Sequence, residues 1–112
     1  MPTILLIDDE NSVRMLLRIA LEGEGYEVVE AVNGRQGLAL YGERLPDLVI
    51  TDITMPEMNG LEMMLELNRH YSNVKVIAIS GEPDNLAFAK QLGACGAIQK
   101  PVSYTHLTLP TN

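Results

Sequence analysis

Short runs of apolar residues alternate along the chain with longer stretches in which apolar residues recur every three or four positions. The short runs predict strands that are buried on both faces of a sheet. The longer stretches predict amphipathic helices with one apolar face. The expected strands are 4–7, 27–30, 48–50, 74–79 and 96–99, and the expected helices span about 13–21, 34–44, 61–70 and 83–92.

Each predicted strand but the last is followed by a helix after a few residues. Such a repeat favours a parallel sheet with helices on both faces. The expected fold class is therefore α/β, a flavodoxin-like doubly wound sheet of five parallel strands in the order 2-1-3-4-5. Asn11 or Ser12 is expected to cap the first helix, and Gly23 or Gly25 to end it. The second helix is expected to be weaker, because Gly37 and Gly42 interrupt it.

The pattern stops after Lys100 and Pro101. A complete fold of this kind would continue there with a fifth helix that covers the second face of the sheet. Residues 102–112 contain no Asp, Glu, Lys or Arg, three Thr and no helical stripe. They resemble the translation of an adapter used in sequencing libraries. We therefore expect one domain over residues 1–101 that lacks the fifth helix, and a non-native, irregular tail over 102–112.

Composition narrows the class of protein. The formal net charge is −7, and an acidic domain repels phosphate backbones, so direct binding of nucleic acid is not expected. Cys95 is the only cysteine, which excludes a disulfide within the chain and suits a reducing cytosol. No run approaches the roughly 20 apolar residues of a membrane span. A cytoplasmic protein without membrane contact is expected.

Polar residues follow or close four of the predicted strands. Asp8 and Asp9 follow the first strand, Asp52 the third and Lys100 the fifth, and Ser80 closes the fourth. The carboxyl ends of parallel strands share one edge of the sheet, where ligands of such folds bind. A single Asp after a strand is usually only a turn former or a helix cap. The joint placement of five such residues instead predicts that they form one site.

The residue types indicate which chemistry this edge can perform. Three clustered carboxylates repel one another unless a cation lies between them, and Mg²⁺ prefers oxygen ligands. With one cysteine and two histidines in the chain, a zinc site is not supported. Lys100 and the Ser80 hydroxyl can bind phosphate oxygens, and a carboxylate can attack phosphorus to form an acyl phosphate. Positioning and charge neutralisation are most of what phosphoryl transfer needs.

Four segments resemble the signature blocks of response-regulator receiver domains, which belong to two-component and phosphorelay signalling. They are ILLIDDE (4–10), DLVITDITMPEMNG (47–60), VIAISG (76–81) and KP (100–101). The resemblance implies that Asp52 is the phosphoacceptor, which receives its group from a sensor histidine kinase or a His-phosphotransfer protein. Ser80 would swing toward the phosphoryl group and Lys100 would pair with Asp52 or its phosphate. The phosphoprotein would act as a switch on a downstream effector domain or protein.

The resemblance also implies a magnesium site. The side chains of Asp9 and Asp52 would bind Mg²⁺, Asp8 would act largely through water, and the backbone carbonyl of Thr54 would complete the protein ligands. The domain would not be an enzyme in the ordinary sense, although it would assist its own Mg²⁺-dependent phosphotransfer and dephosphorylation.

One position departs from the family pattern. Ala97 stands three residues before Lys100, where the family usually has an aromatic residue that flips inward with the hydroxyl. We hypothesise that signalling instead passes through the loop after Ser80 and the helix 83–92.

Three alternative functions fit the sequence less well. A non-phosphorylated pseudo-receiver that serves as an interaction module would be favoured if an acidic residue or Lys100 were missing, and none is. An aspartate-nucleophile phosphatase needs an Asp two residues after the nucleophile, and Glu10 stands there relative to Asp8. A dinucleotide-binding enzyme needs a glycine-rich turn after the first strand, which this chain lacks.

Overall fold

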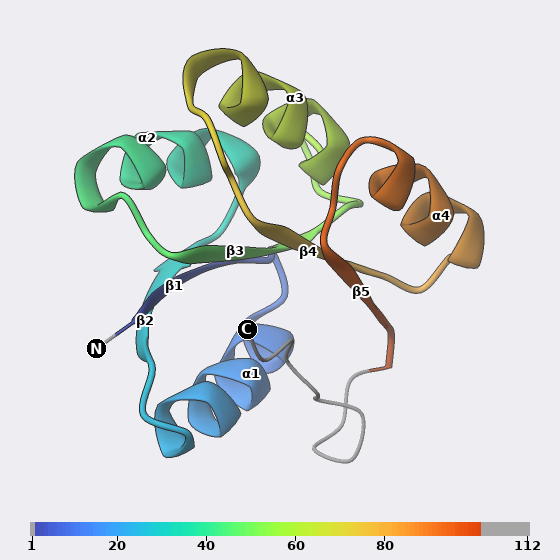
Figure 1. Ribbon diagram of the computed structural model, residues 1–112. Helices are drawn as coiled ribbons and strands as arrows, with labels where there is room; N and C mark the ends of the chain where they lie inside the picture. Colours follow the sequence, from blue (N-terminus) through green and yellow to red (C-terminus); the bar gives the residue numbers. More distant parts are fainter. Residues whose placement is uncertain (1, 102–112) are drawn as a thin grey trace.

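The computed structural model describes residues 2–101, in which five strands alternate with four helices (Figure 1). The elements are β1 (Thr3–Ile7), α1 (Asn11–Gly23), β2 (Glu27–Ala31), α2 (Gly34–Arg44), β3 (Leu48–Asp52), α3 (Gly60–His70), β4 (Val76–Ser80), α4 (Pro83–Gln91) and β5 (Gly96–Gln99). The strands are all parallel, in the order β2-β1-β3-β4-β5. The predicted fold class and strand order are confirmed, and no fifth helix occurs within residues 2–101. The predictions for 102–112 concern residues outside the described part.

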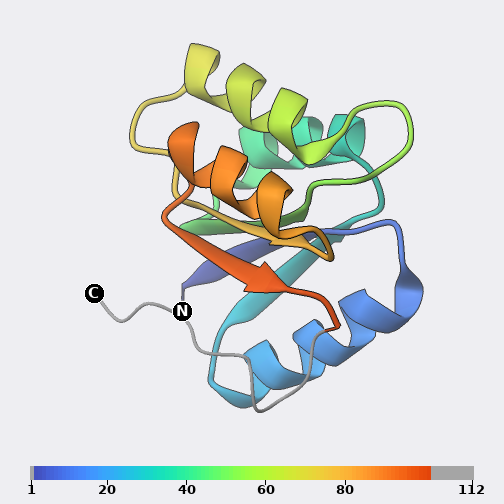
Figure 2. The same cartoon turned by 90° about the vertical axis from the view of Figure 1, so that its right-hand side faces the viewer.

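The sheet is the middle layer, with helices on both faces. Helices α2, α3 and α4 lie on one face and α1 lies on the other (Figures 1 and 2). Alternate strand residues pack into the two layers, because successive side chains of a strand point to opposite faces. Leu5 and Val49 join the core under α2 and α3, whereas Ile4 and Ile50 join the core with α1 residues such as Leu17. None of the four helices can span a membrane, since each lacks the necessary length and apolar character.

Four of the five predicted strands differ in their bounds from those observed by one or two residues, and the first helix starts earlier than predicted. β3 runs through Asp52 and β4 runs from Val76 through Ser80, so both polar residues are the last residues of their strands. The prediction that Asn11 or Ser12 caps α1 is wrong, since Glu10 occupies the N-cap position and its side chain makes no cap hydrogen bond. The helix starts early because the Glu10 backbone N–H donates to Asp8 Oδ1 at 2.9 Å, which holds Glu10 extended.

Gly37 has a packing role that explains why it lies inside a helix. A Cβ atom at this position would come within 2.5 Å of Ile7 Cδ1 and 3.2 Å of Met63 Sδ. The missing side chain therefore lets α2 approach β1 and α3 closely. Helix α2 continues through Gly37 without a break, so close packing against the sheet compensates for the low helix propensity.

Candidate functional site

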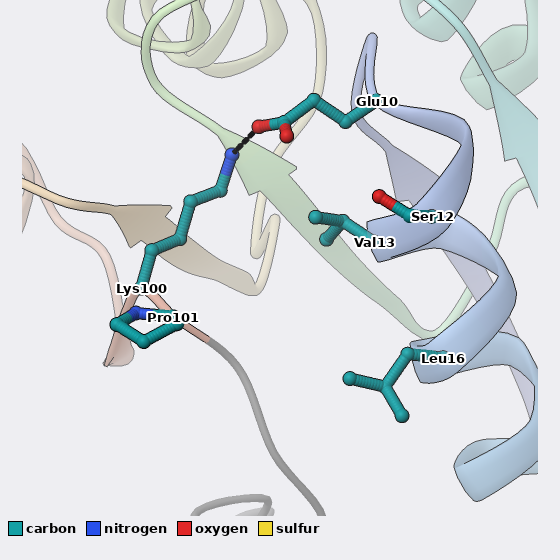
Figure 3. A pocket seen from close by; sticks show the side chains of 6 residues that line it. All are labelled: Glu10, Ser12, Val13, Leu16, Lys100 and Pro101. Carbon is teal, nitrogen blue, oxygen red and sulfur yellow. Dashed lines mark hydrogen bonds and ion pairs between the residues drawn. The ribbon is translucent and has the colours of Figure 1, made fainter.

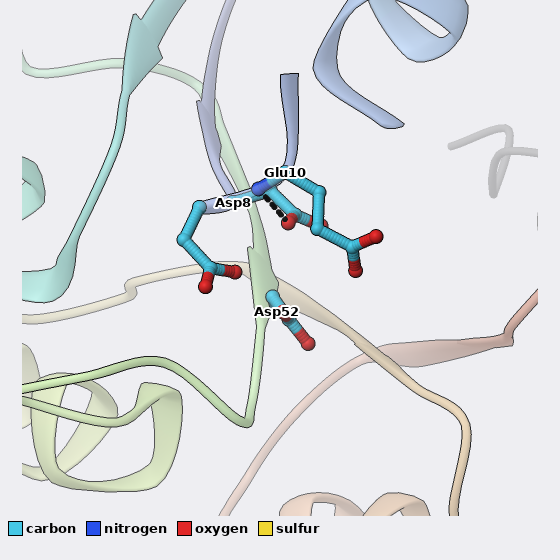
Figure 4. A group of neighbouring side chains, drawn as sticks. Asp8, Glu10 and Asp52 are labelled. Carbon is cyan, nitrogen blue, oxygen red and sulfur yellow. Dashed lines mark hydrogen bonds between the residues drawn. The ribbon is translucent and has the colours of Figure 1, made fainter. Parts of the chain in front are cut away.

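Four acidic side chains meet at the carboxyl edge of the sheet. Each of Asp8, Asp9, Glu10 and Asp52 offers a carboxylate oxygen, and these oxygens all lie within 4.8 Å of one another. Figure 4 shows Asp8 and Glu10 from the end of β1 beside Asp52 from β3. They meet because β1 and β3 are neighbours in the sheet. Asp8 and Asp52 are buried, whereas Asp9 and Glu10 are exposed.

The backbone around Asp8 and Asp52 holds both residues in place. The Asp8 N–H donates to the Ala31 carbonyl at 3.2 Å, which extends the pairing of β1 with β2 by one residue. After Asp52, the Ile53 N–H donates to the Ile79 carbonyl of β4 at 3.0 Å. Gly60 packs directly behind Asp52, since a Cβ atom there would come within 2.4 Å of the Asp52 carbonyl oxygen. The two carboxylates therefore rest on fixed backbone.

Lys100 joins this cluster from the end of β5. Its backbone N–H donates to the Ser80 carbonyl at 2.9 Å, and its side chain extends over the acidic residues. The Nζ atom lies 2.6 Å from Glu10 Oε1, 3.2 Å from Asp52 Oδ2 and 3.5 Å from Asp8 Oδ2. Burial acts to lower the pKa of Lys100, but the three carboxylates outweigh it and raise that pKa. The ammonium therefore stays charged.

Burial makes the two inner carboxylates harder to ionise. It raises the pKa of Asp8 to about 6, opposed by the Glu10 N–H and reinforced by the charge of Asp52. It also raises the pKa of Asp52, although Lys100 and a backbone hydrogen bond from Thr54 act in the opposite direction. Both carboxylates are therefore under electrostatic strain near neutral pH.

Ser80 and Thr54 lie at the border of the cluster. Ser80 is buried, and its Oγ accepts a hydrogen bond from the Glu82 N–H at 3.0 Å, which leaves the hydroxyl proton available for another acceptor. It is the last residue of β4, next to β3 in the sheet. Thr54 is exposed, two residues beyond Asp52. The roles predicted for the site residues stay predictions.

Glu10 is the residue of this site whose role the sequence interpretation missed. It directly follows Asp9, so its position in the first signature block is a local signal. Its contact is not local, because Glu10 and Lys100 are 90 residues apart in the chain.

The donor set fits a hard divalent cation. Asp8 Oδ2 is buried and has no hydrogen-bond partner within the described residues, and the Lys100 ammonium 3.5 Å away is shared with Glu10 and Asp52. Such an atom is costly to bury without a close donor or cation of its own. Within residues 2–101 the ion pairs to the cluster all come from Lys100, which pairs with three of the four carboxylates, so the cluster carries more negative than positive charge. Clustered carboxylate oxygens are ligands that Mg²⁺ accepts.

Comparisons with known proteins agree with this geometry. The model of the family described as "Response regulator receiver domain" matches residues 4–110. The chain is 41% identical over 101 residues to chemotaxis protein CheY of Thermotoga maritima, a match that covers 88% of this chain and 84% of that protein. It is 36% identical over 100 residues to sporulation initiation phosphotransferase F of Bacillus subtilis, which covers 88% and 81%.

Solved structures show the same likeness. The response regulator TrrA of Thermotoga maritima, in complex with Mg²⁺ and BeF, has a TM-score of 0.85 at 33% identity and covers 93% of this chain and 90% of its own. The family match over residues 4–110 includes the four signature blocks, so the resemblance stated from the sequence is confirmed. With this fold and this edge, the chain belongs to the response-regulator receiver domains, the signalling modules of two-component systems.

Proposed function

We propose that the protein is phosphorylated on Asp52 by a sensor histidine kinase or a His-phosphotransfer protein, with Mg²⁺, and acts as a conformational switch. One observation carries the proposal. Asp52 is a buried carboxylate whose Oδ2 lies 3.2 Å from Lys100 Nζ, with three other acidic residues close by. The cytoplasm, where kinases of this kind present their phosphohistidine, is the proposed location.

The reaction follows from the placement of Asp52. A carboxylate oxygen of Asp52 attacks the phosphorus atom of the donor and forms a new P–O bond. The bond between phosphorus and the donor atom breaks, and its electron pair leaves with the donor, as acetate does when acetyl phosphate is used. The product is an acyl phosphate on Asp52. Lys100 holds its positive charge against the phosphoryl oxygens, where negative charge must be stabilised.

The acidic residues would hold the metal. Asp9 and Asp52 would bind Mg²⁺ directly, Asp8 largely through water, and Thr54 through its backbone carbonyl. When bound, the ion supplies charge neutralisation and orients phosphoryl oxygens for in-line transfer. The Asp8 oxygen that lacks a hydrogen-bond partner among residues 2–101 supports this assignment.

Ser80 is the proposed link from phosphorylation to a change of shape. Its hydroxyl would donate to a phosphoryl oxygen, and it already contacts the backbone of Glu82 at the start of α4. Ala97 pairs with Ala78 in the sheet and provides no aromatic ring. The loop after β4 and helix α4 would therefore transmit the signal to an effector domain or protein.

Two of the similar solved structures support phosphorylation and partner binding by this protein, because both contain a phosphoryl mimic and one contains a partner protein. TrrA was solved with Mg²⁺ and BeF. One chain of the CheX–CheY complex of Borrelia burgdorferi, a complex that contains BeF3 and Mg²⁺, resembles this chain with a TM-score of 0.86 at 27% identity. In that complex a receiver domain binds another protein.

Incubation with acetyl phosphate and Mg²⁺, followed by intact-mass measurement, tests the proposal. Wild type should gain the mass of one phosphoryl group, and Asp52→Asn should gain none because it lacks the nucleophile. Asp47→Asn is the matched control, since Asp47 precedes the same strand at its opposite end. A wild type that stays unlabelled would contradict the proposal and favour a non-phosphorylated interaction module.

A further inference from the structure

Glu10 has a backbone that is held on both sides and a side chain that the helix does not use. Its N–H donates to Asp8 Oδ1 at 2.9 Å, and its carbonyl accepts from the Arg14 N–H at 3.1 Å in the first turn of α1. At an N-cap the usual side-chain task is to accept a hydrogen bond from the helix start. Glu10 makes no such bond. Its carboxylate is therefore available for another partner.

That partner is the Lys100 ammonium. Glu10 Oε1 accepts from Lys100 Nζ at 2.6 Å (Figure 3). This contact is shorter than the Asp52 contact at 3.2 Å and the Asp8 contact at 3.5 Å. The three carboxylates differ sharply in exposure. The Glu10 side chain is 53% exposed, whereas those of Asp8 and Asp52 are 0% and 4% exposed.

We propose that Glu10 is a positioning residue for Lys100, which holds the ammonium in the resting protein and yields it to the phosphoryl group on Asp52. This inference rests on the proposed function. Glu10 makes and breaks no covalent bond. It competes for the ammonium, and so it sets how readily Asp52 is phosphorylated.

Exposure decides which partner Lys100 gives up. An exposed carboxylate that loses its ion pair is solvated by water, so the loss raises the free energy only slightly. A buried carboxylate that loses its ion pair is left with an uncompensated charge, which raises the free energy strongly. A phosphoryl group brings three strong acceptor oxygens and added negative charge. Lys100, with three N–H donors, therefore exchanges Glu10 for the phosphoryl group and stays over the buried acids.

The surroundings give Glu10 room to move away. A cavity of about 480 Å³ borders both Glu10 and Lys100, and Val13 and Leu16 of α1 form its apolar wall (Figure 3). Among the described residues, this space lets the carboxylate turn away from Lys100 while the Glu10 backbone remains bound to Asp8 and Arg14.

The first test reads the ion pair without metal or phosphate. The NMR signal of the Lys100 ammonium is compared in metal-free wild type, Glu10→Gln and Glu24→Gln. Glu24→Gln is the matched control, since it makes the same change at the other end of α1. The Lys100 signal should move in Glu10→Gln alone. An unchanged signal in Glu10→Gln would overturn the inference.

The second test reads the exchange itself. In wild type labelled at the Glu carboxyl carbons, Mg²⁺ alone is added first and beryllofluoride second. The Glu10 signal should move at the second addition toward its position in Lys100→Gln, where the pair cannot form. A Glu10 signal that ignores beryllofluoride, while other residues near Asp52 respond, would overturn the inference.

The third test measures the consequence for the reaction. With acetyl phosphate and saturating Mg²⁺, Glu10→Gln should be labelled about three- to tenfold faster than wild type, because one competing negative charge is gone. Glu24→Gln should match wild type. Equal rates for all three would overturn the inference and leave the proposed function intact. No labelling of wild type would instead overturn the proposed function, while the Lys100 signal would still report the ion pair.

Discussion

The strands of this protein bury two kinds of residue, and the two kinds affect stability in opposite ways. Along their length the strands bury aliphatic side chains, such as Leu5 and Ile50. At their carboxyl ends they bury Asp8 and Asp52. Apolar burial stabilises the fold, whereas buried carboxylates resist ionising and cost stability near neutral pH. A single step along the chain, from Ile7 to Asp8, separates the two regions.

This difference shows that the groups able to react lie at the acidic edge, where their burial lowers the stability of the fold. The interior has no such cost, since its side chains fill space between helices and sheet. The edge keeps carboxylates concentrated around one ammonium, a state that favours an arriving cation. Strongly perturbed acids in one place are typical of functional sites. The comparison can be tested by changes in each region.

The largest effect on stability is expected in the interior. Leu67 of α3 is fully buried, so Leu67→Ala should lower the free energy of unfolding by about 2–5 kcal/mol through lost burial and a cavity. Leu65→Ala on the same helix is the control, because Leu65 is 49% exposed. Its effect should stay within about 0.5 kcal/mol in urea denaturation. Similar losses for both variants would contradict the assignment of the core.

Gly60 lies where the two regions meet, and a smaller loss is expected there. Gly60→Ala would push a Cβ atom to 2.4 Å from the Asp52 carbonyl oxygen, so the backbone must shift. We expect a loss of about 1–3 kcal/mol and slower labelling by acetyl phosphate. Gly23→Ala is the control, since nothing lies within 4 Å of a Cβ there. Wild-type stability and labelling in Gly60→Ala would show that the contact tolerates a methyl group.

At the acidic edge, stability should depend on pH in an unusual direction. Folding raises the pKa of Asp8 from 3.8 to about 6, so the folded state binds this proton more tightly. The associated stability is present below the lower value and is lost as pH rises through 6. In the presence of a chelator, the free energy of unfolding of wild type should rise relative to that of Asp8→Asn by roughly 1–3 kcal/mol as the pH is lowered from 7 to about 4. A difference that stays flat in chemical denaturation across this range would refute it.

The smallest effect on stability is expected at a surface ion pair, and its dependence on pH should have the opposite sign to that of Asp8. Burial acts to raise the pKa of Glu30, but hydrogen bonds from Arg18 and Arg14 lower it below 4.5. Stability from this group is therefore present above 4.5 and is lost as pH falls below it. Glu30→Gln should cost under about 1 kcal/mol at pH 7, since Arg18 and Glu30 are partly exposed. A cost that grows as pH falls would reverse the assigned sign.

The pattern of the chain predicted most of the elements and their order. The 34–44 helix and the 96–99 strand have the predicted bounds, because apolar periodicity and nearby glycines act over a few residues. The first helix start was misplaced, since the capping preference of Asn11 and Ser12 lost to the hydrogen bond between Asp8 and Glu10. Local preference is a weak determinant when a neighbouring side chain binds the same backbone.

By itself the sequence determined which residues reach the carboxyl edge, because strand ends and the parallel topology follow from the chain pattern. Only the tertiary structure decided how those residues contact one another. Packing between segments up to 90 residues apart decides the burial of Asp8 and the Glu10–Lys100 pair. It also leaves Asp8 Oδ2 without a hydrogen-bond partner in the part of the chain that the structure describes. Ionisation and ion pairing respond to three-dimensional surroundings, which no local pattern of residues describes.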